Sequence, residues 1–459
     1  MKVNRRDILR LIGNGFGTLG LANLLDRPAR SSPAETRAPH FAPKAKRVIY
    51  LFMNGGMSHI DTFDPKPVLD KRHGEPLPGP KVQTDRASGN LMRSPFKFKK
   101  CGQSGIEVSE IFPQVGARID DCCLIRSTWS DNGNHEPSML MGNCGHNLPG
   151  RPSMGSWITY GLGTENQNLP GFMVLCPGYP VGGAQLWDSS FLPSLHQGVH
   201  VPNNEIEADK LVRNIRNSNL TLADQKRQLA LLDKLNRGYL DQMGGHSGLE
   251  NAIASMEVAF KMQIEAPEVF DLAREGEATR ARYGDTYFGR GCLMALRLVE
   301  RGVRMVEVYY GNFQPWDSHD DIRAHAKLAR GADGPIAALI DDLKSRGLFR
   351  ETLIVVGTEF GRTPMIQNSG LEKLCNGRDH NVHGWTTLLA GGGVKGGFVY
   401  GATDEFGMRA AENKVHVHDL HATILHLLGI DHTRLTYRYS GRDYRLTDVG
   451  GKVVREIVG

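Results

Sequence analysis

Residues 352–364 read TLIVVGTEFGRTP, and RDHNVHGWTTLLA (residues 378–390) follows closely. Each stretch joins a short apolar run, of the kind that forms a buried strand, to a polar loop. In the first stretch one carboxylate, Glu359, follows the apolar run and lies in a loop between two glycines. In the second, His380 and His383 stand just before the run. Acidic and imidazole side chains at the ends of neighbouring buried strands predict a site at one edge of a sheet.

Apolar runs alternate with helical segments along the rest of the chain. This alternation predicts an α/β fold with a mostly parallel sheet sandwiched by helices, formed by residues 41–459. A Pro-, Gly- and Lys-rich segment is expected to be a long surface loop, and a charged segment with regularly spaced leucines is expected to be a helical insertion. The expected elements are strands at 47–53, 122–128, 303–309 and 352–356, helices at about 288–301, 334–346 and 418–428, the loop at about 65–105 and the insertion at about 205–275.

The N-terminus resembles a twin-arginine export signal. Arg5 and Arg6 directly precede a mildly apolar stretch, residues 11–25, that is too short and too interrupted to span a bilayer comfortably. An ordinary amphipathic first helix is the alternative interpretation. We expect residues 1–40 to be a leader and linker that engage the twin-arginine export machinery. On this interpretation the protein is a bacterial periplasmic or envelope protein. It has no expected transmembrane domain, except for the leader if the leader is retained as an anchor.

Composition narrows the function classes. The formal net charge of +5 is small for 459 residues, and no block of basic residues is interleaved with aromatic ones. These features argue against a nucleic-acid binder. The seven cysteines have irregular spacing and no C-x-x-C pattern, so they do not predict a disulfide framework.

The polar residues after the predicted strands form a set of candidate ligands. Oxygen and imidazole donors without a nearby cysteine suit a divalent metal such as zinc, manganese, iron, magnesium or calcium. Such a metal could polarise an ester oxygen, and Arg362 could clamp a phosphate or sulfate oxygen. The candidates are Asn54, His59, Asp61, His135, Asp317, His319, Asp321, Glu359, Asp379, His380 and His383.

Structural roles compete with these assignments. Asp317 and His319 could belong to a polar turn, and Glu359 could pair with Arg362 three residues later. His135 stands where a helix is expected to begin, so it could cap that helix instead of taking part in catalysis. The residues alone leave these alternatives open.

Taken in chain order, the motifs resemble the alkaline-phosphatase-like superfamily, and sulfatases in particular. A closer resemblance is to the uncharacterised sulfatase-like bacterial family called "domain of unknown function fifteen-oh-one". That family combines a twin-arginine leader with five motifs that also occur in this chain. The matching segments are Asn54-Gly55-Gly56, His59-x-Asp61, Trp316-Asp317-Ser318-His319, Glu359 to Pro364, and Asp379 to Gly384.

The resemblance implies roles for particular residues. Asn54 falls where the superfamily has its first metal-binding aspartate, and His135 falls on the position of the nucleophile. Glu359 matches the acid of a later metal-binding pair, and Phe360 replaces the second ligand of that pair. The chain has no Cys-x-Pro-x-Arg motif, so formylglycine is not expected. Because Asn54 and Phe360 replace two ligands of the superfamily, the remaining candidate ligands are expected to hold a single ion. They are chiefly Asp317, His319, Glu359, His380 and His383.

Two hypotheses follow from the sequence. The first is an exported metal-dependent hydrolase of phosphate or sulfate esters, in which His135 and Arg362 are catalytic and the metal ligands are Asn54, Asp317, His319, Glu359, His380 and His383. The second is a non-catalytic member of the same fold that binds a partner protein, an anionic small molecule, or a sulfated or phosphorylated glycan. A third interpretation, an envelope-anchored protein, depends on retention of the leader.

Overall fold

The computed structural model describes residues 36–79, 84–166, 168–204, 211, 220–242, 256, 260–262, 265–367 and 376–459. Most of the predicted leader, residues 1–40, lies outside the described residues. Much of the predicted insertion at 205–275 does so too, although α8 (Leu222–Gln242) within it is helical. Within the described parts of the chain, no helix is both long enough and apolar enough to cross a bilayer.

A nine-stranded sheet forms the centre of the molecule. Its main path runs β14-β5-β13-β9-β1-β8-β6-β7, and β17 pairs with β5 beside that path. The strands are β1 (Arg47–Phe52), β5 (Cys122–Trp129), β6 (Phe172–Leu175), β7 (Val199–Val201), β8 (Met305–Tyr309), β9 (Thr352–Gly357), β13 (Trp385–Gly391), β14 (Phe398–Tyr400) and β17 (Val415–His416).

The sheet is mostly parallel, as predicted. β1 is parallel to both of its neighbours, β8 and β9, whereas β13 is antiparallel to β9 and β5. Because β13 runs the opposite way, its N-terminal end lies at the same edge of the sheet as the carboxyl ends of β5 and β9. The loop that precedes β13 therefore reaches the edge where the sequence predicts a site.

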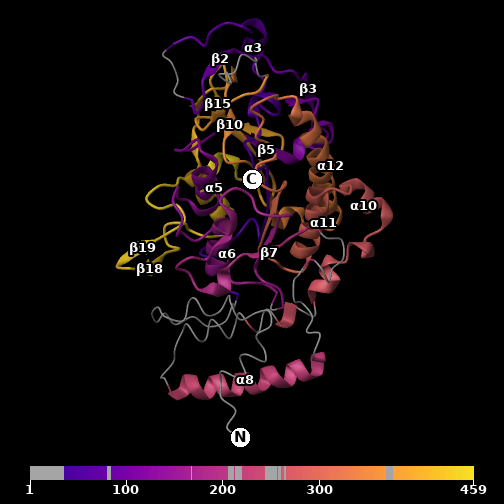
Figure 1. Ribbon diagram of the computed structural model, residues 1–459, viewed down its shortest axis with the longest axis vertical. Helices are drawn as coiled ribbons and strands as arrows, with labels where there is room; N and C mark the ends of the chain where they lie inside the picture. Colours follow the sequence, from indigo (N-terminus) through magenta and orange to yellow (C-terminus); the bar gives the residue numbers. More distant parts are fainter. Residues whose placement is uncertain are drawn as a thin grey trace.

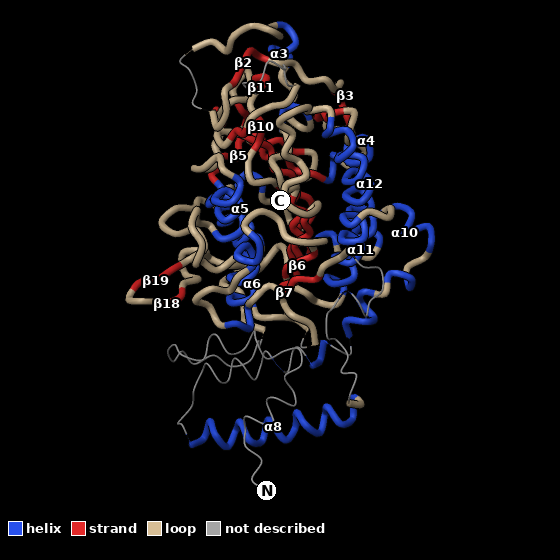
Figure 2. The backbone as a smooth tube through the Cα atoms, viewed as in Figure 1, coloured by secondary structure: helices blue, strands red, loops and turns tan. Residues whose placement is uncertain are grey.

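Helices cover both faces of the sheet, which completes the expected sandwich. Figures 1 and 2 show α11 and α12 on one side of the strands and α5 and α6 on the other. The longer helices of the body include α5 (His135–Cys144), α6 (Met154–Leu162), α10 (Glu277–Tyr283), α11 (Tyr287–Glu300), α12 (Ala324–Ser345) and α13 (Val417–Leu427).

The alternation of side chains along β1 explains this two-sided cover. Ile49 and Leu51 pack into the core beneath α11 and α12, and Val48 and Phe52 pack into the core beneath α5, α6 and α13. A strand whose two faces are both buried must be apolar throughout, and this is why the sequence shows a continuous run here instead of alternation.

Two of the predicted elements need correction. Residues 65–105 are not one surface loop, because they contain α3 (Pro67–Lys71), β2 (Ser88–Leu91) and β3 (Phe98–Cys101). The helix predicted at 334–346 begins ten residues earlier, and Pro335 lies inside it. Proline is disfavoured in a helix interior, but the buried face continues upstream through Ala329 and Ala332, and this packing outweighs the local signal.

Five short two-stranded sheets lie outside the central sheet in the described part of the chain. One of them joins β10 (Gly361–Arg362) to β12 (His380–Asn381), and so pairs the stretch that carries Glu359 with the stretch that carries His380. The others are β2 with β11 (Met365–Gln367), β3 with β4 (Ile106–Ser109), β15 (Ala402–Thr403) with β16 (Ala410–Glu412), and β18 (Tyr437–Tyr439) with β19 (Arg442–Tyr444). A short helix, α4 (Pro113–Gly116), precedes β5.

One buried acid in the central sheet makes the stability sensitive to pH. Glu307 on β8 is fully buried, and its Oε1 atom has no hydrogen-bond partner among the described residues. Burial raises the pKa of Glu307 to about 8, and donation by the hydroxyl of Tyr309 opposes the rise only weakly. Because the folded pKa lies above the unfolded value, folding favours the protonated acid. This stabilisation is fully present below the unfolded pKa and is lost as pH rises toward 8.

We therefore expect Glu307→Gln to flatten the pH dependence of stability. Between pH 5 and pH 8 the wild type should lose up to about 1.4 kcal/mol per pH unit relative to the variant. Urea unfolding of both proteins across this range measures the difference. Parallel curves for the two proteins would show that Glu307 does not hold a proton in the folded state.

Candidate metal centre

Loops from four elements meet at the predicted edge of the sheet. Glu359 follows β9 and Asp317 lies in the loop after β8, while His135 begins the helix that follows β5. His380 lies on β12, and the β10–β12 ladder places it opposite Arg362. The carboxyl ends of parallel strands thus bring together residues that are far apart in the sequence.

Three imidazoles are held in the same orientation by oxygen atoms. The Nδ1 atom of His380 lies 2.8 Å from the carbonyl oxygen of Gly133, and that of His135 lies 2.7 Å from Glu359 Oε1. The Nδ1 atom of His319 is hydrogen bonded to Gln367 Oε1. Carbonyl and carboxylate oxygens only accept hydrogen bonds, so each Nδ1 atom carries a hydrogen. In the neutral rings, each Nε2 atom therefore presents a lone pair.

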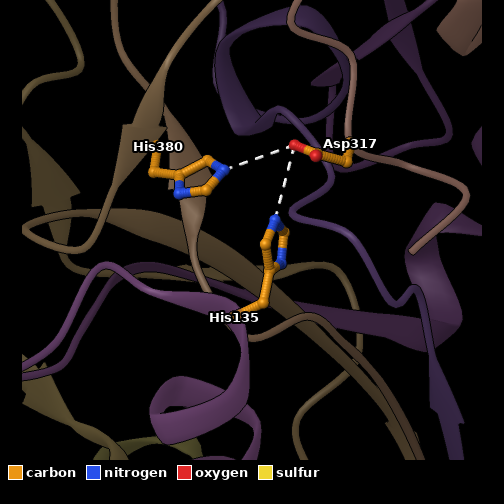
Figure 3. A group of neighbouring side chains, drawn as sticks. All are labelled: His135, Asp317 and His380. Atoms are coloured by element: carbon orange, nitrogen blue, oxygen red, sulfur yellow. Dashed lines mark hydrogen bonds and ion pairs between the residues drawn. The ribbon is translucent and has the colours of Figure 1, made fainter. Parts of the chain in front are cut away.

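These Nε2 atoms converge on one carboxylate oxygen, Asp317 Oδ1. The distances to it are 2.9 Å from His319, 3.3 Å from His380 and 3.5 Å from His135. The Nε2 atoms of His319 and His380 are themselves 3.0 Å apart. Figure 3 shows His135 and His380 approaching Asp317 from two different segments of the chain.

The donor set fits a bound cation. Two nitrogen lone pairs at such short range repel each other unless a proton or a metal ion lies between them. Donors around a tetrahedral zinc, each about 2.0–2.1 Å from the ion, are roughly 3.3 Å apart, which is close to the separations in this cluster. His135 Nε2 and Asp379 Oδ1 are buried without a hydrogen-bond partner among the described residues. Two overlapping groups satisfy the spacing of metal ligands: His135, Asp317 and His380, and His319, Asp379 and His380.

The electrostatics of the cluster centre on Asp317. Burial raises the pKa of this carboxyl, but its close contacts with the three imidazoles and the charge of Arg362 together bring the pKa well below its usual range. Asp317 is therefore ionised at any physiological pH. Arg362 Nη2 lies 2.6 Å from its Oδ1 atom, and Gln314 donates to its Oδ2 atom at 2.8 Å.

The pKa values of two histidines shift in opposite directions. Burial lowers the pKa of His135, but the carboxylates of Asp317 and Glu359 outweigh burial and raise the pKa to about 9. For His380, burial and the nearby charges of Arg362 and His135 lower the pKa despite the proximity of Asp317. Without a metal, the cluster thus places its positive charge on His135 and keeps His380 neutral.

Glu359 orients His135 and does not belong to either group of residues with metal-ligand spacing. Its two oxygens accept from the backbone N–H of Gly55 at 2.9 and 3.2 Å, and Oε2 also accepts from the hydroxyl of Thr358. Its Oε1 atom also holds His135 Nδ1, an arrangement typical of the carboxylates that fix metal-binding histidines. The ring of Phe360 packs 4.3 Å from that of His380 and 4.9 Å from that of His135, between ring centroids, so this side of the cluster is apolar.

Two further residues that were predicted to be metal ligands, Asn54 and His383, are also placed differently from expectation. Asn54 donates to the carbonyl oxygens of Gly311 and Phe313, at 3.0 and 2.6 Å, and ties the end of β1 to the loop after β8. His383 is exposed and belongs to neither group with metal-ligand spacing. These two residues are therefore not brought into the donor set.

Arg362 is not free to clamp an anion in this arrangement. Its guanidinium is fully buried and donates to the backbone carbonyls of Gly56 and Arg378 at 2.8 and 3.2 Å, to that of Gly55, and to Asp317. This geometry favours a role in positioning Asp317 over direct contact with a substrate.

The remaining candidates lie around the cluster. Asp61 forms a fully buried ion pair with Arg378, with Nε and Oδ2 2.7 Å apart, and His59 Nε2 lies 2.8 Å from the carbonyl oxygen of Gly407. Asp321 is paired with Arg323 at the surface. Sequence reasoning missed Gln367 and the Gly133 carbonyl, which orient His319 and His380. No motif marks either of them, because one lies past the end of the Glu359 stretch and the other acts through its backbone.

Fold and site together define the class: an α/β protein with a His/Asp cluster at the carboxyl edge of a mostly parallel sheet. The sequence model of one family, described as "Protein of unknown function (DUF1501)", matches residues 45–458. The chain belongs to this family, and this confirms the membership predicted from the motifs. No curated protein matches the sequence.

Several solved structures are similar at low identity. The lipoteichoic acid synthase LtaP from Listeria monocytogenes is 8% identical, with 90% of this chain and 78% of that chain covered and a TM-score of 0.35. The PsFucS1 sulfatase from Pseudoalteromonas sp. is 11% identical, with 84% and 68% covered and a TM-score of 0.33. The alkaline phosphatase from the Antarctic bacterium TAB5 is 9% identical, with 84% and 98% covered and a TM-score of 0.32.

Proposed function

We propose that the protein is an exported metal-dependent hydrolase of phosphate or sulfate esters. The observation that carries the proposal is the convergence of three imidazole Nε2 atoms on Asp317 Oδ1, with every Nδ1 atom held by an oxygen acceptor. Three imidazoles and a carboxylate favour zinc, manganese or iron over magnesium or calcium, which prefer oxygen ligands. A cation held there would polarise an ester oxygen and lower the pKa of water.

Three residues around the cluster each have a distinct role in shaping the site. Glu359 fixes the tautomer and orientation of His135, and Arg362 keeps Asp317 ionised and aimed at the histidines. Phe360 excludes water from one side of the cluster, which strengthens the electrostatic interactions inside it. No hydrogen bond joins a described Ser, Thr or Cys side chain to Asp317 Oδ1 or to the three Nε2 atoms, and this favours activated water over a covalent nucleophile.

A second candidate function is binding without catalysis. The occupied guanidinium of Arg362 leaves the described site without a free cationic side chain to stabilise a transferring phosphoryl or sulfuryl group. A protein that uses its cluster to bind an anionic small molecule or glycan would tolerate this arrangement.

Turnover of aryl esters distinguishes the two candidates. The metal-loaded wild type should hydrolyse an aryl phosphate or an aryl sulfate, and His380→Ala should lose that activity by about a hundredfold or more. His383→Ala is the matched control, because it removes an exposed imidazole three residues away. Equal background rates for all three proteins would leave binding as the function and contradict the hydrolase proposal.

Glu359→Gln tests the role of the orienting carboxylate. We expect metal affinity to fall by about ten- to a hundredfold, as is typical when a group that orients a metal ligand is changed. The amide keeps the shape of the side chain, so folding should be little affected. Competition with a chromophoric chelator measures the affinity, and an unchanged value would show that Glu359 does not orient a metal ligand.

A further inference from the structure

A surface far from the metal cluster combines exposed apolar side chains with arginines. We call it the hairpin face, and it consists of Leu148, Arg151, Tyr439, Arg445 and Val449. It lies where the loop after α5 meets the β18–β19 hairpin, and this hairpin projects from the side of the body in Figures 1 and 2. His135 begins α5 and this loop follows its other end, so the ten-residue helix separates the two sites by roughly 15 Å.

Three side chains of the hairpin face are among the most exposed apolar residues of the described chain. Val449 is 84% exposed, Leu148 is 64% exposed and Tyr439 is 42% exposed. They lie on three separate loops or strands, and the ring of Tyr439 is stacked on that of Phe191, with centroids 5.0 Å apart. Apolar side chains that gather on one exposed surface beside polar residues are typical of sites that contact a membrane or another protein.

An arginine-lined hollow lies among these side chains. It is small and opens to solvent, and Arg151, Arg445 and His146 contribute to its lining. Arg151 stacks on the ring of Tyr444 at 4.2 Å and has no ion-pair or hydrogen-bond partner among the described residues. Arg445 Nε and Nη2 donate to the backbone oxygens of Asp448 and Gly450, with no carboxylate partner among the described residues.

The charge of this face is positive. Residues 437–452 contain four basic and two acidic side chains, and Arg151 adds another positive charge from the facing loop. One lining acid, Asp448, is already paired with Arg442. The imidazole of His146 is held in the same loop as Leu148, because its Nδ1 atom lies 3.1 Å from the backbone nitrogen of Leu148.

We propose that the hairpin face docks on an anionic lipid surface, with a headgroup phosphate held between Arg151 and Arg445. The side chains of Leu148 and Val449 enter the boundary between headgroups and acyl chains, and Tyr439 lies at headgroup level, where aromatic rings with a polar end are favoured. A soluble anionic glycan would use the arginines but would leave the two aliphatic tips unexplained.

Vesicle sedimentation of the full chain tests this proposal. We expect binding to vesicles made of equal parts phosphatidylglycerol and phosphatidylcholine, and little binding to phosphatidylcholine alone. Leu148→Ser combined with Val449→Ser should weaken the partition coefficient by about tenfold or more. Arg151→Gln should weaken it by about fivefold. Arg280→Gln on α10, across the body from the hairpin in Figure 1, is the matched control and should change nothing.

Several results would overturn the proposal. One is equal binding of the wild type and the double serine variant, which would place membrane affinity in another segment such as the N-terminus. Another is binding of a sulfated oligosaccharide that depends on Arg151 while vesicles fail to bind, which would make the hollow a glycan subsite. Asp317→Asn should leave vesicle binding unchanged, so failure of this inference is separable from failure of the hydrolase proposal.

Discussion

Asp317→Ala is expected to reduce the affinity for zinc or manganese by more than about a hundredfold, because every convergent imidazole shares this carboxylate. The same change removes the carboxylate partner of the fully buried Arg362, and an uncompensated buried charge costs about 3–5 kcal/mol of stability. Titration with metal, monitored by calorimetry on the folded variant, measures the first effect. Urea unfolding measures the second.

His383→Ala is the control for this experiment, since its imidazole is exposed and belongs to neither group with metal-ligand spacing. Its metal affinity should match that of the wild type. If Asp317→Ala binds metal within a few-fold of the wild type while remaining folded, the convergent cluster is not the metal site.

The second large effect is expected from the ion pair between Arg378 and Asp61. Both side chains are fully buried, and Arg378 also donates to the backbone oxygens of Met92 and Thr363 at 3.0 and 3.3 Å. Arg378→Met leaves Asp61 charged and unpaired, so we expect a loss of about 3–5 kcal/mol in the free energy of unfolding. The pair joins the loop after β1 to the segment that carries His380, so metal affinity should fall as well.

A double-mutant cycle checks this interpretation. Asp61→Asn added to Arg378→Met removes the orphaned charge, so the double variant should be more stable than Arg378→Met alone. Additive losses in urea unfolding would show that the two residues act independently of each other.

Much of the sheet could be predicted because its strands are buried on both faces. The runs that form β1, β5, β8 and β9 are mostly apolar, and their structural bounds fall within two residues of the predicted ones. The antiparallel direction of β13 could not be predicted, since a continuous apolar run carries no information on strand direction. The start of α12 was misplaced because Pro335 is tolerated within a packed helix.

The site was predictable in position but not in detail. The loops that carry Asp317, His319, Glu359 and His380 all reach the expected edge of the sheet, because strand ends dictate where loops emerge. The division between direct donors and orienting groups depends on side-chain direction, which no spacing reveals. For this reason Glu359 proves to orient His135, and Asn54 proves to join two loops.

The metal content of the purified wild type shows whether the His/Asp cluster binds an ion. After expression in metal-replete medium, elemental analysis should find one transition-metal ion per chain, and the double variant His319→Ala, His380→Ala should retain almost none. A wild type that carries no stoichiometric metal, or a double variant that carries as much as the wild type, would contradict the assignment of this His/Asp cluster as a metal centre.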